Sequence, residues 1–383
     1  MTERIVVVGA SLAGLRTVQG LRRRGSPAHI TLIGEEPDLP YDRPPLSKSV
    51  LLGTASAESV RFLDGGSLAS LEVDLRLGMA ARRLDVRRRY IELDDGDHVD
   101  FDRVVISTGC SPRILRGMRQ LAGVHMLRTI GDALRIRAGL LGASRVAVVG
   151  GGFIGSEVAS AAIELGRTVA VIDSLPTLMT RGLGAELGTR MTDFHRRQGV
   201  DMHLNCGVSE LVGTEAVEGL RLADGSVLPA DLVVVGIGAV PNDAWLASSG
   251  LPLNDGVVCD EFLCAADGVY AVGDVARWHN PRYGQLMRME HWTSANEQAT
   301  ALSATLTGTP TPCNLLPNVW SDQFGKRLQI FGRIAPDDEI DVVFDEDDRF
   351  VAVARRDGCL QAAVAFDALK QVLPYRMQLA KNG

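Results

Sequence analysis

The chain has 383 residues, of which 46% are hydrophobic and 23% charged, so it is long enough for two or three domains with cores of their own. Its net charge of −7 argues against a general nucleic-acid binder, which normally carries a basic surface. No apolar run approaches the length of a membrane span, and the first strand pattern begins too early to leave room for a signal peptide. We therefore expect a cytoplasmic protein that binds neither nucleic acid nor membranes.

The first stretch, residues 4–14, has the pattern of a dinucleotide-binding turn. A β-branched apolar run breaks at Gly9 and passes into a helix pattern, and a second strand then closes at Glu35. Gly9 permits the tight turn, Gly14 lets helix and strand pack closely, and Glu35 is placed to bond a ribose hydroxyl. Ser11 replaces the second glycine of the motif, and its small side chain still lets the backbone approach a pyrophosphate.

A proline-rich segment, residues 40–48, follows the second strand and carries Arg43 and Lys48. Its prolines impose a fixed, non-helical path. Composition leaves two interpretations open: a solvated surface loop, or a rigid arm that places one cation on a phosphate and the other near a redox ring. Residues 73–100 are then expected to form small antiparallel strands, with a hairpin turn at 94–96.

A second, complete fingerprint lies near the middle of the chain. All three glycines of the motif are present, at Gly150, Gly152 and Gly155, and the helix and strand that follow end at Asp173. A carboxylate at that position accepts hydrogen bonds from a free 2′-hydroxyl and repels a 2′-phosphate. The pattern therefore favours NADH over NADPH, although Arg181 lies close enough in sequence to leave the preference open.

The chain also repeats itself. An Asp-Gly turn, a valine-rich strand, a glycine and a proline occupy residues 95–112 and recur in the same order 129 residues later. A repeat of this length indicates two similar dinucleotide-binding units rather than a solenoid. One enzyme with two such sites most naturally holds a flavin in one and a nicotinamide cofactor in the other.

Beyond the repeat, a strand at 269–272 ends in a glycine followed by Asp274, at the sheet edge where open α/β sheets hold their ligands. Residues 288–292 are expected to start a helix. After a linker at 308–312, strand-like runs and a late helix at about 366–372 predict a small third domain. Six scattered cysteines without a CxxC pair indicate reduced structural thiols and no metal site.

The predicted fold class is α/β, with two Rossmann-like dinucleotide-binding domains of glutathione-reductase-like architecture and a small α+β C-terminal domain. We expect a discontinuous FAD-binding domain at 1–111 and 236–310, an NAD(H)-binding domain at 112–235, and the C-terminal domain at 311–383.

Four segments resemble the oxygenase-coupled, NADH-dependent ferredoxin reductases, namely residues 40–48 (PYDRPPLSK), 273–276 (GDVA), 290–292 (EHW) and 320–323 (WSDQ). The resemblance covers essentially the whole chain, and the first segment is its most specific part. It implies FAD-dependent hydride transfer from NADH, followed by single-electron transfer to a small [2Fe–2S] ferredoxin that serves a cytochrome P450 or a ring-hydroxylating oxygenase. We expect a monomer or a weak homodimer.

The same resemblance implies roles for individual residues. The residues implied to hold FAD are Gly9, Ser11, Gly14, Glu35, Arg43, Lys48, Thr108, Gly109, Asp274 and Trp292. Those implied to hold NADH are Gly152, Phe153, Ile154, Gly155, Asp173, Arg181, Gly238 and Glu290. The residues expected to act next to the flavin are Lys48, in a pair with Glu157, together with Trp292 and Trp320.

Several alternatives stay open. The alternative for the two tryptophans is a role as core aromatics, and for Glu157 a solvated position on its helix, whereas His291 is expected to be structural. As a whole, the chain could be a rubredoxin reductase, or an NADH-binding, redox-sensing flavoprotein of apoptosis-inducing-factor type. A dithiol reductase is disfavoured, because residues 43–48 occupy the region where such enzymes carry a CxxxxC pair.

Overall fold

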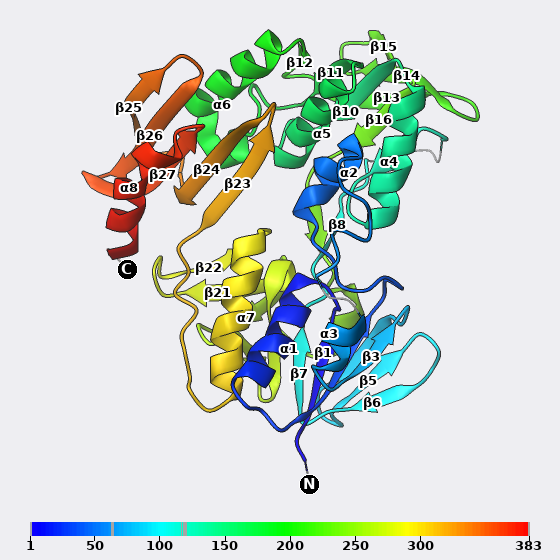
Figure 1. The fold of residues 1–383 in the computed structure, drawn as a ribbon, viewed down its shortest axis with the longest axis vertical. Coiled ribbons are helices and arrows are strands. Elements are labelled where there is room, and N and C mark those ends of the chain that lie inside the picture. The colour runs from blue at the N-terminus through cyan, green and yellow to red at the C-terminus, as the bar shows by residue number, and fades with distance from the viewer. Residues whose placement is uncertain (1, 63–64, 116, 118–120, 382–383) are drawn as a thin grey trace.

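The computed structural model describes residues 2–62, 65–115, 117 and 121–381. Two lobes are visible in Figure 1, one containing α1 and α7 and the other containing α4 and α5. The C-terminal strands and helix lie beside the second lobe and end at its outer edge.

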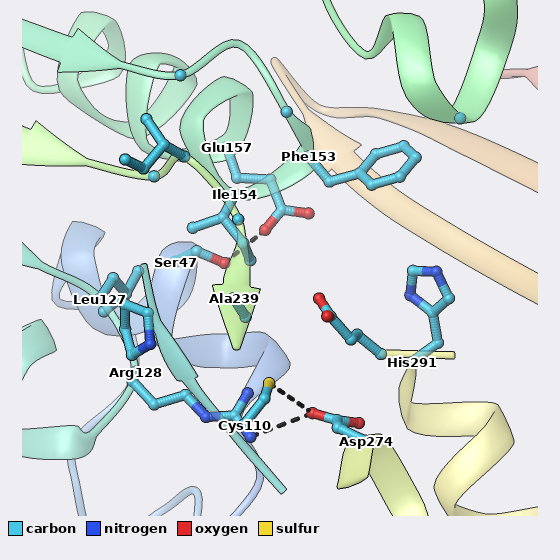
Figure 2. A pocket seen from close by; sticks show the side chains of 18 of the residues that line it. Ser47, Cys110, Leu127, Arg128, Phe153, Ile154, Glu157, Ala239, Asp274 and His291 are labelled. Atoms are coloured by element: carbon cyan, nitrogen blue, oxygen red, sulfur yellow. Dashed lines mark hydrogen bonds and ion pairs between the residues drawn. The ribbon is translucent and has the colours of Figure 1, made fainter. Parts of the chain in front are cut away.

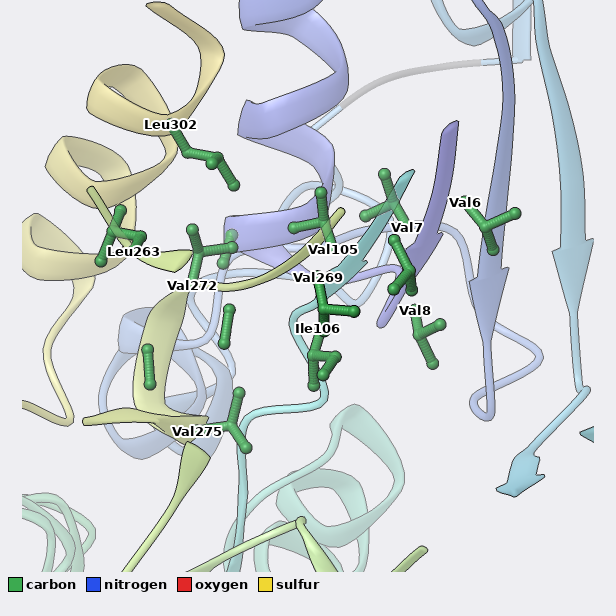
Figure 3. Packing of buried hydrophobic residues seen from close by; sticks show 14 of the residues in the cluster. Val6, Val7, Val8, Val105, Ile106, Leu263, Val269, Val272, Val275 and Leu302 are labelled. Atoms are coloured by element: carbon green, nitrogen blue, oxygen red, sulfur yellow. The ribbon is translucent and has the colours of Figure 1, made fainter. Parts of the chain in front are cut away.

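The first lobe is built on a six-stranded sheet with the order β19-β20-β7-β1-β2-β3. Its inner strands run parallel, and α1 (Leu12–Arg23) packs beside α7 (Trp292–Leu306). Valine and isoleucine side chains of the two central strands pack with Val269, Val272 and Leu302 in one buried cluster (Figure 3). The strands are β1 (Arg4–Val8), β2 (His29–Gly34), β3 (Val73–Leu77), β7 (Arg103–Ile106), β19 (Cys264–Ala266) and β20 (Val269–Ala271).

Two three-stranded sheets complete this lobe, and the structure of the lobe corrects two of the expected elements. Residues 73–77 were expected to pair antiparallel, but β3 extends the main sheet parallel to β2, because the long connection through the arm permits a parallel crossover. The helix expected at 288–292 begins only at Trp292, because Arg288 ends a strand paired with its neighbour. The two sheets contain β4 (Ala81–Asp85), β5 (Tyr90–Leu93), β6 (His98–Asp100), and β18 (Val257–Cys259), β21 (Ala276–Asn280), β22 (Gln285–Arg288).

The second lobe contains a five-stranded parallel sheet, β12-β11-β10-β16-β9, and a small antiparallel sheet, β13-β14-β15. Its strands are β9 (Val124–Met126), β10 (Arg145–Val149), β11 (Thr168–Ile172), β12 (Asp201–His203), β13 (Val208–Gly213), β14 (Val217–Leu222), β15 (Val227–Pro229) and β16 (Leu232–Val235). Its helices are α4 (Ile130–Gly142), α5 (Phe153–Glu164) and α6 (Thr180–Arg197).

The internal repeat is present in three dimensions. In each lobe the repeated strand pairs with the fingerprint strand, and the aspartate before it accepts a hydrogen bond from the first backbone N–H of that fingerprint strand. The distances are 2.7 Å from Arg4 to Asp102 and 2.9 Å from Arg145 to Asp231. The next repeated strands, β8 (Cys110–Pro112) and β17 (Ala239–Pro241), pair with each other, so the two copies meet in a ribbon between the lobes.

The C-terminal domain contains a five-stranded antiparallel sheet whose central strands are buried on both faces. One face shares a core with α5 and α6, and the other packs on Val372 and Leu379 of the last helix. The late helix expected at 366–372 instead spans α8 (Leu369–Lys381), because Phe366 still belongs to the sheet. The sheet order is β23 (Asn318–Gln323), β24 (Lys326–Gly332), β27 (Cys359–Phe366), β26 (Arg349–Arg356) and β25 (Glu339–Glu346).

The proline-rich arm is packed against the second lobe and partly buried, and is not a solvated loop. Its 3₁₀ turn (Pro44–Ser47) leads into α2 (Ser49–Leu52), and Leu46, Val50 and Leu51 enter the core of the second lobe. α2 lies against α4, as Figure 1 shows. The arm therefore joins the two lobes beside the ribbon. The remaining helix of the described chain is α3 (Gly65–Ala69).

None of the described helices is long and apolar enough to cross a membrane. Among the same residues, no cluster of three or more His, Cys, Asp or Glu side chains is arranged to hold a metal ion. All six cysteines are described, and each is a free thiol.

Candidate functional site: a cavity between two glycine-rich turns

A cavity of about 870 Å³ lies between the two glycine-rich turns, and Figure 2 shows part of its lining. Both lobes, the arm, the β8–β17 ribbon and the C-terminal domain contribute side chains to it. The cavity brings together most of the residues predicted for the site, namely Ser11, Arg43, Lys48, Gly109, Gly152, Phe153, Ile154, Glu157, Asp173, Arg181, Gly238, Asp274, Glu290, Trp292 and Trp320.

Three predicted glycines lie behind the cavity wall and serve packing. A Cβ atom on Gly14 would lie 2.0 Å from the carbonyl oxygen of Gly9, and one on Gly155 would lie 1.9 Å from that of Gly150. Only glycine allows each helix to approach its turn so closely. Gly9 itself has a φ of +120°, and a Cβ there would meet the backbone of Ser107.

Two other predicted residues also lie outside the lining. Glu35 is exposed directly after β2, and it is the next residue, Glu36, that pairs with Arg43 at 2.5 Å. Thr108 donates its hydroxyl to the backbone oxygen of Asn242 at 2.8 Å, which ties the ends of the ribbon together.

The two turns meet the requirements of a pyrophosphate site. α1 begins after Ser11, whose side chain makes no capping bond within the described residues, and α5 begins after Gly152, which has no side chain. Neither first turn contains an acidic residue, so the first backbone N–H groups are left for an anion. By contrast, α4 is closed by a capping box of Thr129 and Asp132. The residues present therefore fit two dinucleotides.

Arg43 is held at the edge of the cavity by both the first turn and the second lobe. Its Nε donates to the Ser11 hydroxyl at 3.3 Å, and its Nη1 donates to the backbone oxygen of Arg128. With the Glu36 ion pair, these bonds fix the guanidinium beside the N-terminus of α1, where its charge favours an anion.

A second polar cluster surrounds Asp274, the one member of the cluster that the sequence predicted as a site residue. The Asp274 carboxylate accepts hydrogen bonds from Arg128 Nη2 at 3.1 Å and from the Cys110 thiol at 3.2 Å (Figure 2). Burial raises the pKa of the Cys110 thiol to about 12, so it stays protonated at neutral pH. Arg128 was not predicted, although the Thr129 capping signal could have placed it at the carboxyl end of a parallel strand.

The tryptophans line the cavity and are therefore not simple core aromatics. The ring centroids of Trp292 and Trp320 are 5.9 Å apart, with the rings edge to face. Trp292 Nε1 donates to Asp42 of the arm at 2.8 Å. His291, the N-cap of α7, packs against Phe153, and burial lowers its pKa to about 4. His291 is therefore neutral at physiological pH.

Lys48 and Glu157 form an ion pair with 2.8 Å between Nζ and Oε2. The Glu157 side chain is only 3% exposed, so it is not a solvated helix residue. The Ser47 hydroxyl donates to the same carboxylate oxygen, and the Ser321 hydroxyl donates to Oε1 at 2.6 Å. Two segments that are far apart in sequence, the arm and the C-terminal sheet, thus supply the donors for one buried carboxylate.

Beyond Ser321 the polar contacts continue into a buried side-chain amide. Gln323 Nε2 donates to the Ser321 hydroxyl at 2.8 Å and lies 3.6 Å from the sulfur of Met179. His195 Nε2 is 2.7 Å from Gln323 Oε1. The sequence motif at 320–323 marked Ser321 and Gln323, but the sequence assigned them no role, and it offered no signal for His195.

Acid should destabilise the protein through His195. Burial lowers the pKa of this side chain to about 4, whereas in the unfolded chain the side chain has its ordinary pKa of 6.5. Between these values only the unfolded state takes up the proton, so the free energy of unfolding falls as the pH drops from about 6.5 to about 4. The full effect is about 3 kcal/mol. His195→Gln keeps a hydrogen-bond donor and cannot titrate. Between pH 7 and pH 4 its free energy of unfolding, measured in urea, should therefore fall by about 3 kcal/mol less than that of the wild type. Equal losses in both proteins would contradict the assignment.

Asp173 is expected to set the preference for the nicotinamide dinucleotide. Its carboxylate accepts hydrogen bonds from the backbone N–H of Gly151 at 2.6 Å and of Leu175 at 2.9 Å, so it also shapes the second turn. Asp173→Ala should raise the KM for NADH. It should also lower the preference of the protein for NADH over NADPH by about tenfold, because repulsion of a 2′-phosphate is lost. Asp173→Asn, which removes the charge and keeps an acceptor, should lower the preference with a smaller rise in KM. Unchanged selectivity in both variants would remove Asp173 from this role.

The fold and the cavity define a class of protein, an oxidoreductase with two dinucleotide sites that face each other. In agreement, residues 3–299 match the family model described as pyridine nucleotide-disulphide oxidoreductase, and residues 318–383 match a reductase C-terminal model. The chain belongs to the pyridine nucleotide-disulphide oxidoreductase family. That family implies FAD and a nicotinamide dinucleotide as cofactors.

Individual relatives narrow the class. The chain is 38% identical over 335 residues to the ferredoxin–NAD(+) reductase component of the p-cumate 2,3-dioxygenase system of Pseudomonas putida, covering 87% of this chain and 82% of the relative. It is 33% identical over 346 residues to rubredoxin–NAD(+) reductase of Ectopseudomonas oleovorans, covering 90% of each.

A solved structure gives the same result. The crystal structure of the covalent putidaredoxin reductase–putidaredoxin complex superimposes with a TM-score of 0.96 at 30% identity, covering 99% of this chain and 93% of the other. The chain is an oxidoreductase of the NADH-dependent ferredoxin reductase family, a group of electron-transfer flavoproteins. This confirms both the resemblance and the fold class predicted from the sequence.

Proposed function

We propose that this chain takes a hydride from NADH with the help of bound FAD and passes single electrons to a small [2Fe–2S] ferredoxin. That ferredoxin would serve a cytochrome P450 or a ring-hydroxylating oxygenase. The observation that carries the proposal is that both glycine-rich turns open into one cavity, so the reactive ends of two dinucleotides can meet. Bound FAD would supply the conversion of an electron pair into single electrons.

The two ends of the cavity suit different dinucleotides. On the side of the first lobe, the N-terminus of α1, Arg43, Arg128 and Asp274 would hold FAD through its phosphates and hydroxyls. On the side of the second lobe, the N-terminus of α5 and Asp173 would hold NADH. Each turn thus offers backbone N–H groups to a pyrophosphate.

Between the two ends lie the side chains proposed to act on the reacting rings. Lys48 brings an ammonium group that Glu157 and the backbone oxygen of Pro44 hold in place. Trp292 and Trp320 bring flat apolar surfaces, which exclude water from a hydride acceptor. Because Trp320 belongs to the C-terminal domain, that domain closes the cavity where an electron acceptor would approach.

The thiols argue against a dithiol relay. Cys110 and Cys206 line the cavity, and all six cysteines are free. A relay needs a thiolate nucleophile, whereas the raised pKa of Cys110 keeps it a neutral hydrogen-bond donor to Asp274.

The proposal is tested by NADH-driven reduction of cytochrome c by the purified protein, with and without a panel of [2Fe–2S] ferredoxins and rubredoxins. Large, saturable stimulation by one [2Fe–2S] ferredoxin is the expected result. Stimulation by rubredoxin alone would make the chain a rubredoxin reductase. Reduction of the flavin by NADH with no acceleration by any carrier, and a long-lived charge-transfer complex, would favour a redox sensor instead.

A further inference from the structure

The side-chain amide of Gln323 has only one possible orientation. The sulfur of Met179 accepts hydrogen bonds and cannot donate them, so the amide nitrogen must face Met179 and the Ser321 hydroxyl. The amide oxygen therefore faces His195, whose Nε2 must carry the proton of that bond. Gln323 is only 1% exposed, so these contacts replace water completely.

The orientation of Gln323 sets the direction of the next bond. Because the Ser321 oxygen accepts from Gln323, its own proton is free to point at Oε1 of Glu157. On the opposite side, the Ser47 hydroxyl and the Lys48 ammonium donate to Oε2. All three of these donors thus point at the buried carboxylate of Glu157. The C-terminal domain supplies the donor to Oε1, and the arm supplies the donors to Oε2.

Gln323 also reaches the second glycine-rich turn. Its partner Met179 lies just before α6 and has a φ of +53°, a backbone conformation that residues other than glycine rarely adopt. The backbone N–H of Met179 donates to the oxygen of Gly151 at 2.8 Å. The bond from Gln323 therefore helps to hold Met179 in a strained conformation against the turn proposed for NADH.

We propose that Gln323 is a positioning residue of the C-terminal domain, which orients Glu157 through Ser321 and so keeps Lys48 in its ion pair. Through Met179, the same amide ties this domain to the second turn. The inference rests on the proposed function only in placing Lys48 at the reacting end of the cavity. The chain of bonds from His195 to Glu157 stands without it.

The rate at which Lys48 is acetylated shows directly whether its ammonium group is held in the ion pair with Glu157. The sequence contains only four lysines, so trace acetylation with acetic anhydride, followed by mass spectrometry, reports on each one. An ammonium group held by a carboxylate is a poor nucleophile, whereas Lys370 and Lys381 are exposed and serve as internal references. The measured quantity is the labelling rate of Lys48 relative to these two, in the flavin-loaded protein.

Two variants break the proposed chain, and a third is the matched control. Ser321→Ala removes the donor to Oε1, and Gln323→Met keeps the length of the side chain without a hydrogen-bonding amide. Ser160→Ala removes a different serine bond between α5 and the end of β23, in which Ser160 accepts from the backbone N–H of Phe324 at 2.7 Å. The control therefore loosens the same interface without touching Glu157.

We expect relative labelling of Lys48 to rise about threefold or more in Ser321→Ala and Gln323→Met, and to stay at the wild-type level in Ser160→Ala. Wild-type labelling in both chain-breaking variants, or an equal rise in the control, would overturn the proposal. If Gln323→Met does not fold, Ser321→Ala against Ser160→Ala decides. Because labelling needs no electron acceptor, failure of every carrier in the cytochrome c assay would overturn the proposed function without altering this result.

Discussion

Gly155→Val is expected to yield a protein that retains FAD but is hardly reduced by NADH. A Cβ atom at this position would lie 1.9 Å from the Gly150 oxygen and 3.2 Å from the side chain of Val148, so α5 must move away from β10. That shift displaces the N-terminal amides of α5, whereas the first turn belongs to the other lobe. A displacement of about 1 Å can cost about 100-fold in rate. We therefore expect flavin bleaching by NADH in stopped-flow mixing to slow by at least that factor.

Gly142→Val is the matched control for this variant. Gly142 ends α4 in the same lobe, and a Cβ atom there would meet nothing within 4 Å, so the same change should leave flavin reduction close to wild type. Suppose instead that Gly155→Val loses FAD while NADH reduces the remaining flavin at the normal rate. The second turn would then hold FAD and the first turn NADH, the reverse of the proposed assignment.

Asp274→Ala is expected to release most of the FAD during purification. Its carboxylate is the ion-pair partner of Arg128 and accepts from Cys110, so its removal leaves a partly buried guanidinium without a counter-charge. Such a loss costs about 2–3 kcal/mol, or about 30- to 150-fold in affinity for FAD. The measurement is the ratio of flavin to protein absorbance after gel filtration, followed by titration of the stripped protein with FAD.

Asp274→Asn distinguishes the contribution of the Asp274 charge to FAD binding from that of the volume of its side chain. It preserves the volume and an acceptor oxygen but not the ion pair with Arg128, so its affinity for FAD should lie between those of wild type and Asp274→Ala. Full flavin occupancy in Asp274→Ala, together with a wild-type far-UV circular dichroism spectrum, would show that Asp274 does not hold the cofactor.

Sequence reasoning succeeded where the physical requirement is local. Gly14 and Gly155 each stand five residues after the glycine that begins their turn, because a helix can approach the turn only without a Cβ at that point. β1 and β10 were recognisable from short β-branched runs that are buried on both faces. The errors at 288–292 and 366–372 arose at element ends, where pairing with another strand decided the outcome.

By itself, then, the sequence determined two dinucleotide turns, their repeat, and the arm that carries Lys48. Only the tertiary structure decided which distant residues complete the site. Glu36 reaches Arg43, and the ion pair of Arg128 with Asp274 joins the two lobes. Ser321 comes to Glu157 only because the C-terminal sheet packs on α5. Periodicity and spacing report contacts within one element, whereas these contacts depend on how separately formed sheets and helices dock against one another.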